Sequence, residues 1–185
     1  MPQAEELTIK RAQKGSQAAL EELIFAYEKK VYNISFRYMG NEADAFDMAQ
    51  ETLIKIYQRI GKFKGQSSFS SWVYRITVNT CLDGLRKRKK NVISFESAAE
   101  NGMAFVDERA ATPEARALSI EKAEDIQKAI DTLNDDHKSV IILRDVNGLS
   151  YEEISQALSI SVGTVKSRIN RGRQKLRQLL VYESF

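Results

Sequence analysis

Side chains that can read the edges of DNA bases are concentrated near the C-terminal end of the chain. Lysine, arginine, serine and asparagine recur there at positions that share one face of a helical repeat. Arginine or lysine suits guanine, asparagine suits adenine, and serine suits either base. This face carries Gly163, Lys166, Ser167, Asn170 and Arg171, and Arg168 and Arg173 lie nearer its rim, within reach of phosphates. The pattern indicates a surface that reads duplex DNA.

Two short helices joined by a tight turn are needed to present that surface. Ser150 and Glu153 have the spacing of a capping box, which predicts the start of the first helix. A break follows at 159–160, and Ser161 can cap a second helix. The second helix has an inward stripe at intervals of four, three and four residues: Val165, Ile169, Gly172 and Leu176. We therefore predict a helix-turn-helix. The alternative is an ordinary amphipathic helix pair with a solvated charged face.

A second group of residues suits single-stranded nucleic acid. A basic loop with a glycine runs from 61 to 68, and a predicted helix from about Phe69 to Lys90 follows it. Aromatic rings stack on bases while cations follow the backbone. The candidates are Lys62, Lys64, Phe69, Trp72, Arg75, Asn79, Arg86 and Arg88. Composition alone equally supports a core role for Phe69, Val73 and Ile76, with 86–90 as a solvated helix end.

The predicted helix between 41 and 60 has an acidic side. Asp44, Asp47 and Glu51 follow one another at intervals of three and four residues, so they share one face. By themselves they indicate a solvated surface. The apolar stripe expected to pack inward consists of Phe46, Ala49, Leu53, Ile56 or Tyr57, and Ile60.

Periodicity and composition together predict an all-α protein with two small helical domains joined by a flexible linker. Nearly every segment has a helical repeat, and no sustained alternation of period two is found. The segment 91–111 loses the repeat and is rich in small and polar residues. The expected domains are 1–90 and 114–185, with 91–113 as the linker. Two basic regions separated by an acidic middle suggest two contacts with nucleic acid.

Several classes of protein are disfavoured by the same sequence. The chain has one cysteine, Cys81, and one histidine, His137, so no disulfide or metal cluster is expected. His137 is expected at the surface. No nucleophile motif or phosphate-binding glycine loop is evident, so we expect neither an enzyme nor a cofactor. Neither a signal peptide nor a membrane-spanning apolar run is found, and a cytoplasmic protein is expected.

The combination of motifs resembles the extracytoplasmic-function sigma factors of bacterial RNA polymerase over essentially the whole chain. In the C-terminal half the resemblance rests on the segments Gly148 to Ile154 and Gly163 to Ile169. In the N-terminal half it rests on Asp44 to Glu51 and Phe69 to Ile76, followed by Asn79 and the basic run. Many regulators share a helix-turn-helix, but both halves in this order are specific to the family.

The resemblance implies roles for each group of residues. Asp44, Asp47, Gln50 and Glu51 would dock on the clamp helices of the largest subunit of bacterial core RNA polymerase. The loop from Lys62 to Ser68, together with the predicted helix that begins at about Phe69, would open and hold the minus-ten element of promoter DNA. The helix-turn-helix, to which the resemblance adds Thr164, would read the minus-thirty-five element beside the flap of the second-largest subunit. An anti-sigma partner is also implied.

The length of the linker adds an expectation about the free protein. A flexible coil from Asn91 to Thr112 typically spans about 26 Å. Two turns of duplex, roughly the separation of the two elements in this family, measure about 70 Å. We therefore expect the free protein to be compact, with its two basic surfaces close together or masked.

Other functions remain open at this stage. A repressor or activator that works without polymerase explains the helix-turn-helix but leaves the Trp72 region and the acidic face without a role. A recombinase would need a nucleophile domain, and a helical adaptor would show no salt-dependent affinity for DNA.

Overall fold

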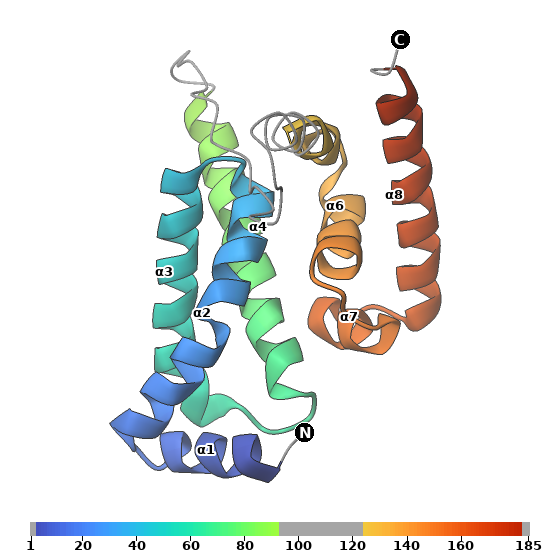
Figure 1. Cartoon of the computed structure of the whole chain (residues 1–185). Coiled ribbons are helices and arrows are strands. Elements are labelled where there is room, and N and C mark those ends of the chain that lie inside the picture. The colour runs from blue at the N-terminus through green and yellow to red at the C-terminus, as the bar shows by residue number, and fades with distance from the viewer. Residues whose placement is uncertain (1–2, 93–123, 183–185) are drawn as a thin grey trace, which may run out of the picture.

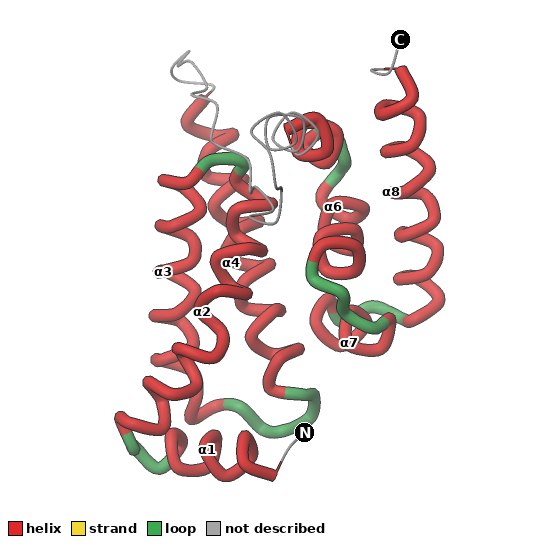
Figure 2. Tube along the Cα trace, viewed as in Figure 1, coloured by secondary structure: helices red, strands yellow, loops and turns green. Residues whose placement is uncertain are grey.

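Every regular element in the described part of the chain, residues 3–92 and 124–182 of the computed structural model, is a helix (Figure 1, Figure 2). The N-terminal segment holds α1 (Gln3–Gln13), α2 (Gln17–Met39), α3 (Glu42–Arg59), the 3-10 turn η1 (Ile60–Lys62) and α4 (Phe69–Val92). The C-terminal segment holds a helix at 124–131, α6 (Asp135–Ile141), the π-helical turn η2 (Ile142–Val146), α7 (Tyr151–Leu158) and α8 (Val162–Tyr182). The all-α prediction is confirmed.

In the N-terminal unit, α2, α3 and α4 pack side by side, and α1 crosses one end of the bundle (Figure 1). Local signals set the ends of these helices. Gly40 ends α2 in the left-handed conformation, with its N–H donating to the Phe36 carbonyl over 2.9 Å. The Asn41 side chain then accepts from the Asp44 N–H and starts α3. Ser68 does the same for α4 by accepting from the Ser71 N–H.

The expected core stripe of α3 is partly wrong. Phe46 and Tyr57, both expected in or near it, are 55% and 57% exposed, and Leu53 only borders the core. Ala49, Ile56 and Ile60 are buried as expected, and Ala45 and Thr52 complete the buried side. Thr52 can face inward because its hydroxyl donates to the Met48 carbonyl over 2.8 Å. If threonine is counted as polar, the predicted buried face of α3 is therefore shifted by one residue from the observed face.

The C-terminal unit is the predicted helix-turn-helix with its supporting helices. Both hydrogen bonds of the Ser150 and Glu153 capping box are present. Ser159 ends α7 with a φ of 56°, and Ser161 accepts from the Thr164 N–H at the start of α8. The stripe that faces inward is the one expected from sequence: Val165, Ile169 and Gly172 are buried and Leu176 packs at the edge of the core.

The two units contact each other along α4 and the C-terminal end of α2. Helix α4 packs against α7. The Tyr38 hydroxyl meets the Ser139 Oγ at 2.7 Å, and the Lys138 ammonium donates to the Tyr38 carbonyl over 3.1 Å. Lys138 is 5% exposed and also pairs with Asp131 at 2.6 Å. Lys138 therefore supplies a donor and a positive charge to the C-terminal end of α2, where helix carbonyls lack partners.

Only the first two residues of the predicted linker belong to the described part of the chain. The predicted linker, 91–113, lies outside the described residues apart from Asn91 and Val92, which continue α4. The compact arrangement expected for the free protein agrees with the contacts between the two units.

Candidate nucleic-acid interface

The outer face of α8 presents the base-reading residues that the sequence suggested. Lys166, Ser167, Asn170 and Arg171 are all exposed, and Gly163 is exposed beside them. Their backbone is held by the buried residues of the opposite side of the helix, which lock α8 against α6 and α7. Predicted positions therefore come together on one rigid face. Thr164 is half-buried, and its hydroxyl lies 2.8 Å from the Ser161 Oγ. The Ser167 hydroxyl donates to the Thr164 carbonyl over 3.0 Å.

The two arginines at the rim of α8 are paired within the protein. Arg168 contacts Asp136 of α6 at 2.7 Å, and Arg173 contacts Asp145 of η2. The hydrogen bond from Arg173 to Asp145 raises the pKa of Arg173 above its ordinary value. Both aspartates lie outside the recognition helix, so sequence reasoning about α8 missed them. They orient the two guanidinium groups and reduce the positive charge available to phosphates.

His137 lies beneath the same basic face and is half-buried. A Cβ built on Gly172 of α8 would be 3.6 Å from the His137 Cβ. Burial, followed by the Lys175 ammonium, lowers the pKa of His137 below its ordinary value of 6.5. Its Nδ1 is buried without a hydrogen-bond partner. The expectation of a surface histidine is therefore only half right.

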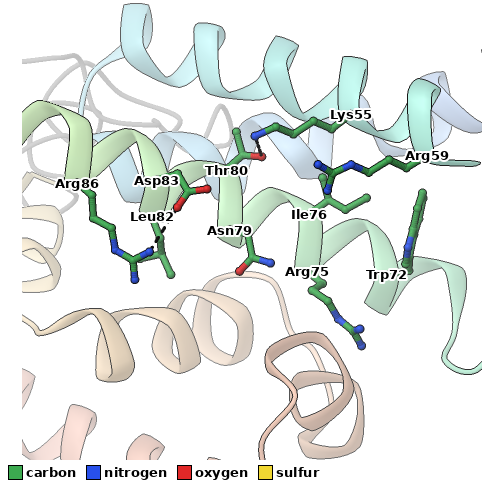
Figure 3. Close-up of a pocket in the computed structure, with 10 residues that line it drawn as sticks. All are labelled: Lys55, Arg59, Trp72, Arg75, Ile76, Asn79, Thr80, Leu82, Asp83 and Arg86. Carbon is green, nitrogen blue, oxygen red and sulfur yellow. Dashed lines mark hydrogen bonds and ion pairs between the residues drawn. The ribbon is translucent and has the colours of Figure 1, made fainter. Parts of the chain in front are cut away.

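A basic groove runs between α3 and α4 (Figure 3). Its cavity has a volume of about 390 Å³ and is lined by Lys55, Arg59, Trp72, Arg75, Ile76, Asn79, Thr80, Leu82, Asp83 and Arg86. Four of the predicted strand-binding residues are brought together here: Trp72, Arg75, Asn79 and Arg86. Lys55 and Arg59 come from α3 and were missed. Their spacing of four residues places them on one face of α3, next to the acidic side formed by Asp44, Asp47 and Glu51, and this spacing is the signal that could have identified them.

Trp72 is the aromatic ring that the groove exposes, whereas Phe69 belongs to the core. Phe69 is 1% exposed, so the prediction that it stacks on a base is wrong for this conformation. Its ring is stacked on Trp72 at 5.5 Å and 30°, and it meets Tyr27 edge-on at 5.4 Å. Val73 and Ile76 are buried as well, as the alternative interpretation expected. Phe69 therefore supports Trp72 from behind.

The remaining predicted cations lie outside the lining of this groove. Lys62 and Lys64 are exposed near the loop that leads into α4. Arg88 is exposed at the far end of α4 and pairs with Asp44 of α3 at 2.8 Å. The ion pair joins one residue predicted for DNA to one predicted for polymerase.

The acidic side of α3 forms a mixed surface of carboxylates and apolar side chains. Asp47 and Gln50 are exposed, and Glu51 pairs with Lys55 at 2.7 Å. Two large apolar side chains of the same helix, Phe46 and Ile54, are each 55% exposed. Sequence reasoning had assigned Phe46 to the core, so it missed the apolar part of this surface. An exposed combination of this kind is typical of a protein docking site.

One residue of the basic groove is bonded to the helix-turn-helix. The Arg75 guanidinium donates to the Gln156 carbonyl of α7. Arg75 and Asn79 also line a second cavity, of about 220 Å³, whose other wall includes Leu158 and Arg168 of the C-terminal unit. A nucleic-acid strand that engaged Arg75 would therefore compete with α7.

Other kinds of site are not seen in the part of the chain that the structure describes. No group of three or more histidine, cysteine, aspartate or glutamate side chains comes together there in a way that could hold a metal ion. Within the same residues, no helix has both the length and the apolar character needed to cross a membrane.

Comparison with protein families matches both units. The family model described as Sigma-70 region 2 matches residues 23–91, and the model described as Sigma-70, region 4 matches residues 123–176. An extracytoplasmic-function (ECF) RNA polymerase sigma factor of Bacillus subtilis, SigW, is 38% identical over 176 residues, which are 93% of this chain and 94% of SigW. The ECF RNA polymerase sigma-E factor of Escherichia coli is 36% identical over 178 residues, with 93% and 92% covered.

Two solved structures share this fold. The structure of CnrH in complex with the cytosolic domain of CnrY has a TM-score of 0.72 and 23% identity, and covers 97% of this chain and 98% of that one. The sigma factor RpoE of Bartonella quintana, in complex with the anti-sigma factor NepR, has a TM-score of 0.68 and 24% identity, with 86% and 95% covered.

Proposed function

Because this chain belongs to the ECF family of RNA polymerase sigma factors, we propose that it directs core polymerase to promoters by two different kinds of DNA contact. The C-terminal unit, within 114–185, reads the minus-thirty-five element as duplex. The N-terminal unit, within 1–90, binds the minus-ten element as a separated strand.

The duplex contact is supported by the exposed face of α8. A helix of this kind enters the major groove and meets base edges with its N-terminal turns. Lys166, Ser167, Asn170 and Arg171 supply the donors and acceptors for base edges. Arg168 and Arg173, oriented by their aspartates, are suited to phosphates at the two sides of the groove.

The single observation that carries the strand contact is the basic groove with Trp72 at one end. Trp72 is the one tryptophan of the chain, and two phenylalanine rings, Phe63 and Phe69, pack against it. Extruding a base from duplex costs a few kcal/mol. Stacking on an aromatic ring returns about 1–3 kcal/mol per base. The cations Lys55, Arg59 and Arg86 line the same groove, which supports their proposed contact with the attached backbone. These terms favour the separated strand.

Binding to polymerase is assigned to the mixed surface of α3. Asp47 and the carboxylate of Glu51 offer negative charge to a basic partner helix, and Gln50 offers a neutral amide for hydrogen bonds. Exposed Phe46 and Ile54 offer apolar area. Charged residues of this kind guide the encounter, and buried apolar residues supply most of the affinity. The clamp helices of the largest subunit are the proposed partner for α3, and the flap of the second-largest subunit is the proposed partner for the C-terminal unit.

The packed arrangement of the two units is proposed to be the inactive form of the free protein. Arg75 is held by α7, so the groove and the helix-turn-helix must separate before the minus-ten strand can use it. An anti-sigma factor accompanies the sigma factor RpoE of Bartonella quintana in a structure of the same fold. An anti-sigma partner that stabilises the packed form is therefore part of the proposal.

The proposed division of labour is tested with Trp72→Ala in holoenzyme. Permanganate footprinting on a promoter selected from a library by run-off transcription measures opening of the minus-ten region. Losing one stacked base should reduce the open complex by about 5- to 150-fold. Trp72→Phe, which keeps an aromatic ring, is the control and should retain most opening. Unchanged opening in Trp72→Ala would refute the stacking role. Failure of the wild-type chain to start transcription with core polymerase would refute the function itself.

A further inference from the structure

The loop between η1 and α4 is polar and largely exposed, so its shape depends on the few groups that hold it. Lys62, Lys64 and Gln66 are exposed, and Gly65 has a φ of +70°. Phe63 is the half-buried apolar side chain that attaches this stretch to the bundle. In the proposed function this loop lies beside the strand-binding groove, so its position affects which bases fit.

Gln13, at the C-terminal end of α1, holds this loop through its backbone. The side-chain Nε2 donates to the Phe63 carbonyl over 2.7 Å and to the Ile60 carbonyl over 3.2 Å. A primary amide carries two N–H groups on one nitrogen, so both hydrogen bonds form at once. The Ile60 carbonyl, at the start of η1, also accepts from the Phe63 N–H over 3.1 Å, so Gln13 reinforces a turn that the backbone already forms, and the Phe63 carbonyl follows directly after that turn.

Other contacts keep α1 in place whether or not Gln13 is present. The Tyr27 hydroxyl donates to the Glu5 carboxylate over 2.7 Å. Ile9 and Ala12 are each 4% exposed and belong to the hydrophobic core. Gln13 therefore projects from a fixed helix toward the loop. Helix α1 precedes the residues matched by the Sigma-70 region 2 model, 23–91, so the match gives it no role.

Phe63 links this anchor to Trp72. The rings of Phe63 and Trp72 have centroids 5.4 Å apart, and Phe63 also meets Phe69 edge-on at 5.4 Å. If the Phe63 backbone moves, Trp72 loses one of the two rings that pack against it. The path from Gln13 to Trp72 thus consists of one pair of hydrogen bonds and one ring contact.

We propose that Gln13 is a positioning residue for minus-ten recognition, because it fixes the backbone of Phe63 and thereby the orientation of Trp72. The role rests on the proposed function of the groove. Loss of a net neutral hydrogen bond changes an equilibrium by about fivefold. The populated position of the loop should change by that factor when the donor is removed.

The first measurement concerns the free protein and does not depend on the function of the groove. Gln13→Met keeps the length of the side chain but removes the donors. Gln17→Met is the matched control, because Gln17 is exposed and bonds only Glu21 on the surface among the contacts described. Since Trp72 is the one tryptophan, acrylamide quenching of its fluorescence reports its packing directly. Quenching should increase in Gln13→Met and stay at the wild-type value in Gln17→Met. Equal quenching in all three proteins overturns the proposal.

The second measurement uses holoenzyme and labelled single strands that carry either the matched minus-ten sequence or one changed base. Gln13→Met should bind the matched strand about fivefold more weakly, and its matched-to-changed ratio should fall. A variant that is only less stable would lose both affinities equally and keep the ratio. Gln13→Lys, which retains N–H donors, should preserve the wild-type ratio of matched to changed strand affinity. Gln13→Met with an unchanged ratio overturns the proposal.

Trp72→Ala in the same assay distinguishes a failure of the role of Gln13 from a failure of the proposed function of the groove. If Trp72→Ala loses the matched strand while Gln13→Met does not, the role of Gln13 is refuted and the proposed function stands. If neither variant changes strand binding, the proposed function of the groove is itself refuted.

Discussion

Ser139→Ala is predicted to open the packed arrangement of the two units. Tyr38 is 1% exposed, and its hydroxyl contacts the Ser139 Oγ at 2.7 Å across the interface. Burial raises the pKa of Tyr38 above its ordinary value of 10, so the phenol keeps its proton. Ser139 already donates to the Asp135 carbonyl over 2.7 Å, which makes Tyr38 the donor between the units.

The size of the effect follows from leaving that donor buried without a partner. Such a group costs about 1–3 kcal/mol, whereas in the open form the Tyr38 hydroxyl is hydrated. The ratio of packed to open protein should therefore fall by about 5- to 150-fold in Ser139→Ala. Removing both partners at once is close to neutral in comparable cases. The double variant Tyr38→Phe with Ser139→Ala should return the ratio toward its wild-type value.

Energy transfer between dyes on the two units measures this ratio. Glu28 on α2 and Gln174 on α8 are exposed and can be replaced by cysteine for labelling. Burial raises the pKa of the Cys81 thiol to about 12, so that residue is protected from the dye at neutral pH. Transfer should decrease in Ser139→Ala, and the affinity of the free protein for the minus-ten strand should increase. The reasoning is refuted if Ser139→Ala keeps wild-type transfer, or if the double variant is as open as the single one.

Two further changes test the packing and the electrostatics of the C-terminal unit. Gly172→Ala should destabilise the protein by about 1–2 kcal/mol in urea unfolding, because a Cβ would lie 2.9 Å from the Cγ1 of buried Ile141. Gly163→Ala, with 3.7 Å to the nearest atom, should be neutral or slightly stabilising, and an equal loss in both variants would contradict the packing argument. The pKa of His137 is lowered in the folded state, so the unfolded chain takes up the proton first and stability is lost as the pH falls below about 6.5. In His137→Gln, the part of the decrease in melting temperature between about pH 7 and 5 that comes from protonation of the histidine should be absent. A melting temperature that depends on pH in the same way as in the wild type would exclude this role for His137.

Much of the candidate site could be predicted because its determinants are local in the chain. Ser150 and Glu153 are three residues apart, so the start of α7 follows from their side-chain chemistry. Val165, Ile169 and Gly172 face inward in α8 because a helix repeats every 3.6 residues. Once that stripe is placed, the exposure of Lys166 and Asn170 follows on the other side.

The errors occurred where packing partners decide between two local possibilities. Phe69 could be a base-stacking ring or a core residue, and its neighbours Tyr27 and Phe63 place it in the core. Phe46 is apolar, yet α3 turns it outward because Thr52 satisfies its own hydroxyl within the helix. Neither outcome is visible in the periodicity of a single segment.

The sequence by itself determined the helices, their caps, the helix-turn-helix and the family to which the chain belongs. Only the tertiary structure decided that Arg168 pairs with Asp136, that Arg75 is held by α7 and that Gln13 anchors the loop after η1. These contacts join residues 32 to 81 positions apart. A hydrogen bond or ion pair over such separations depends on how whole helices pack, and local propensity carries no information about that geometry.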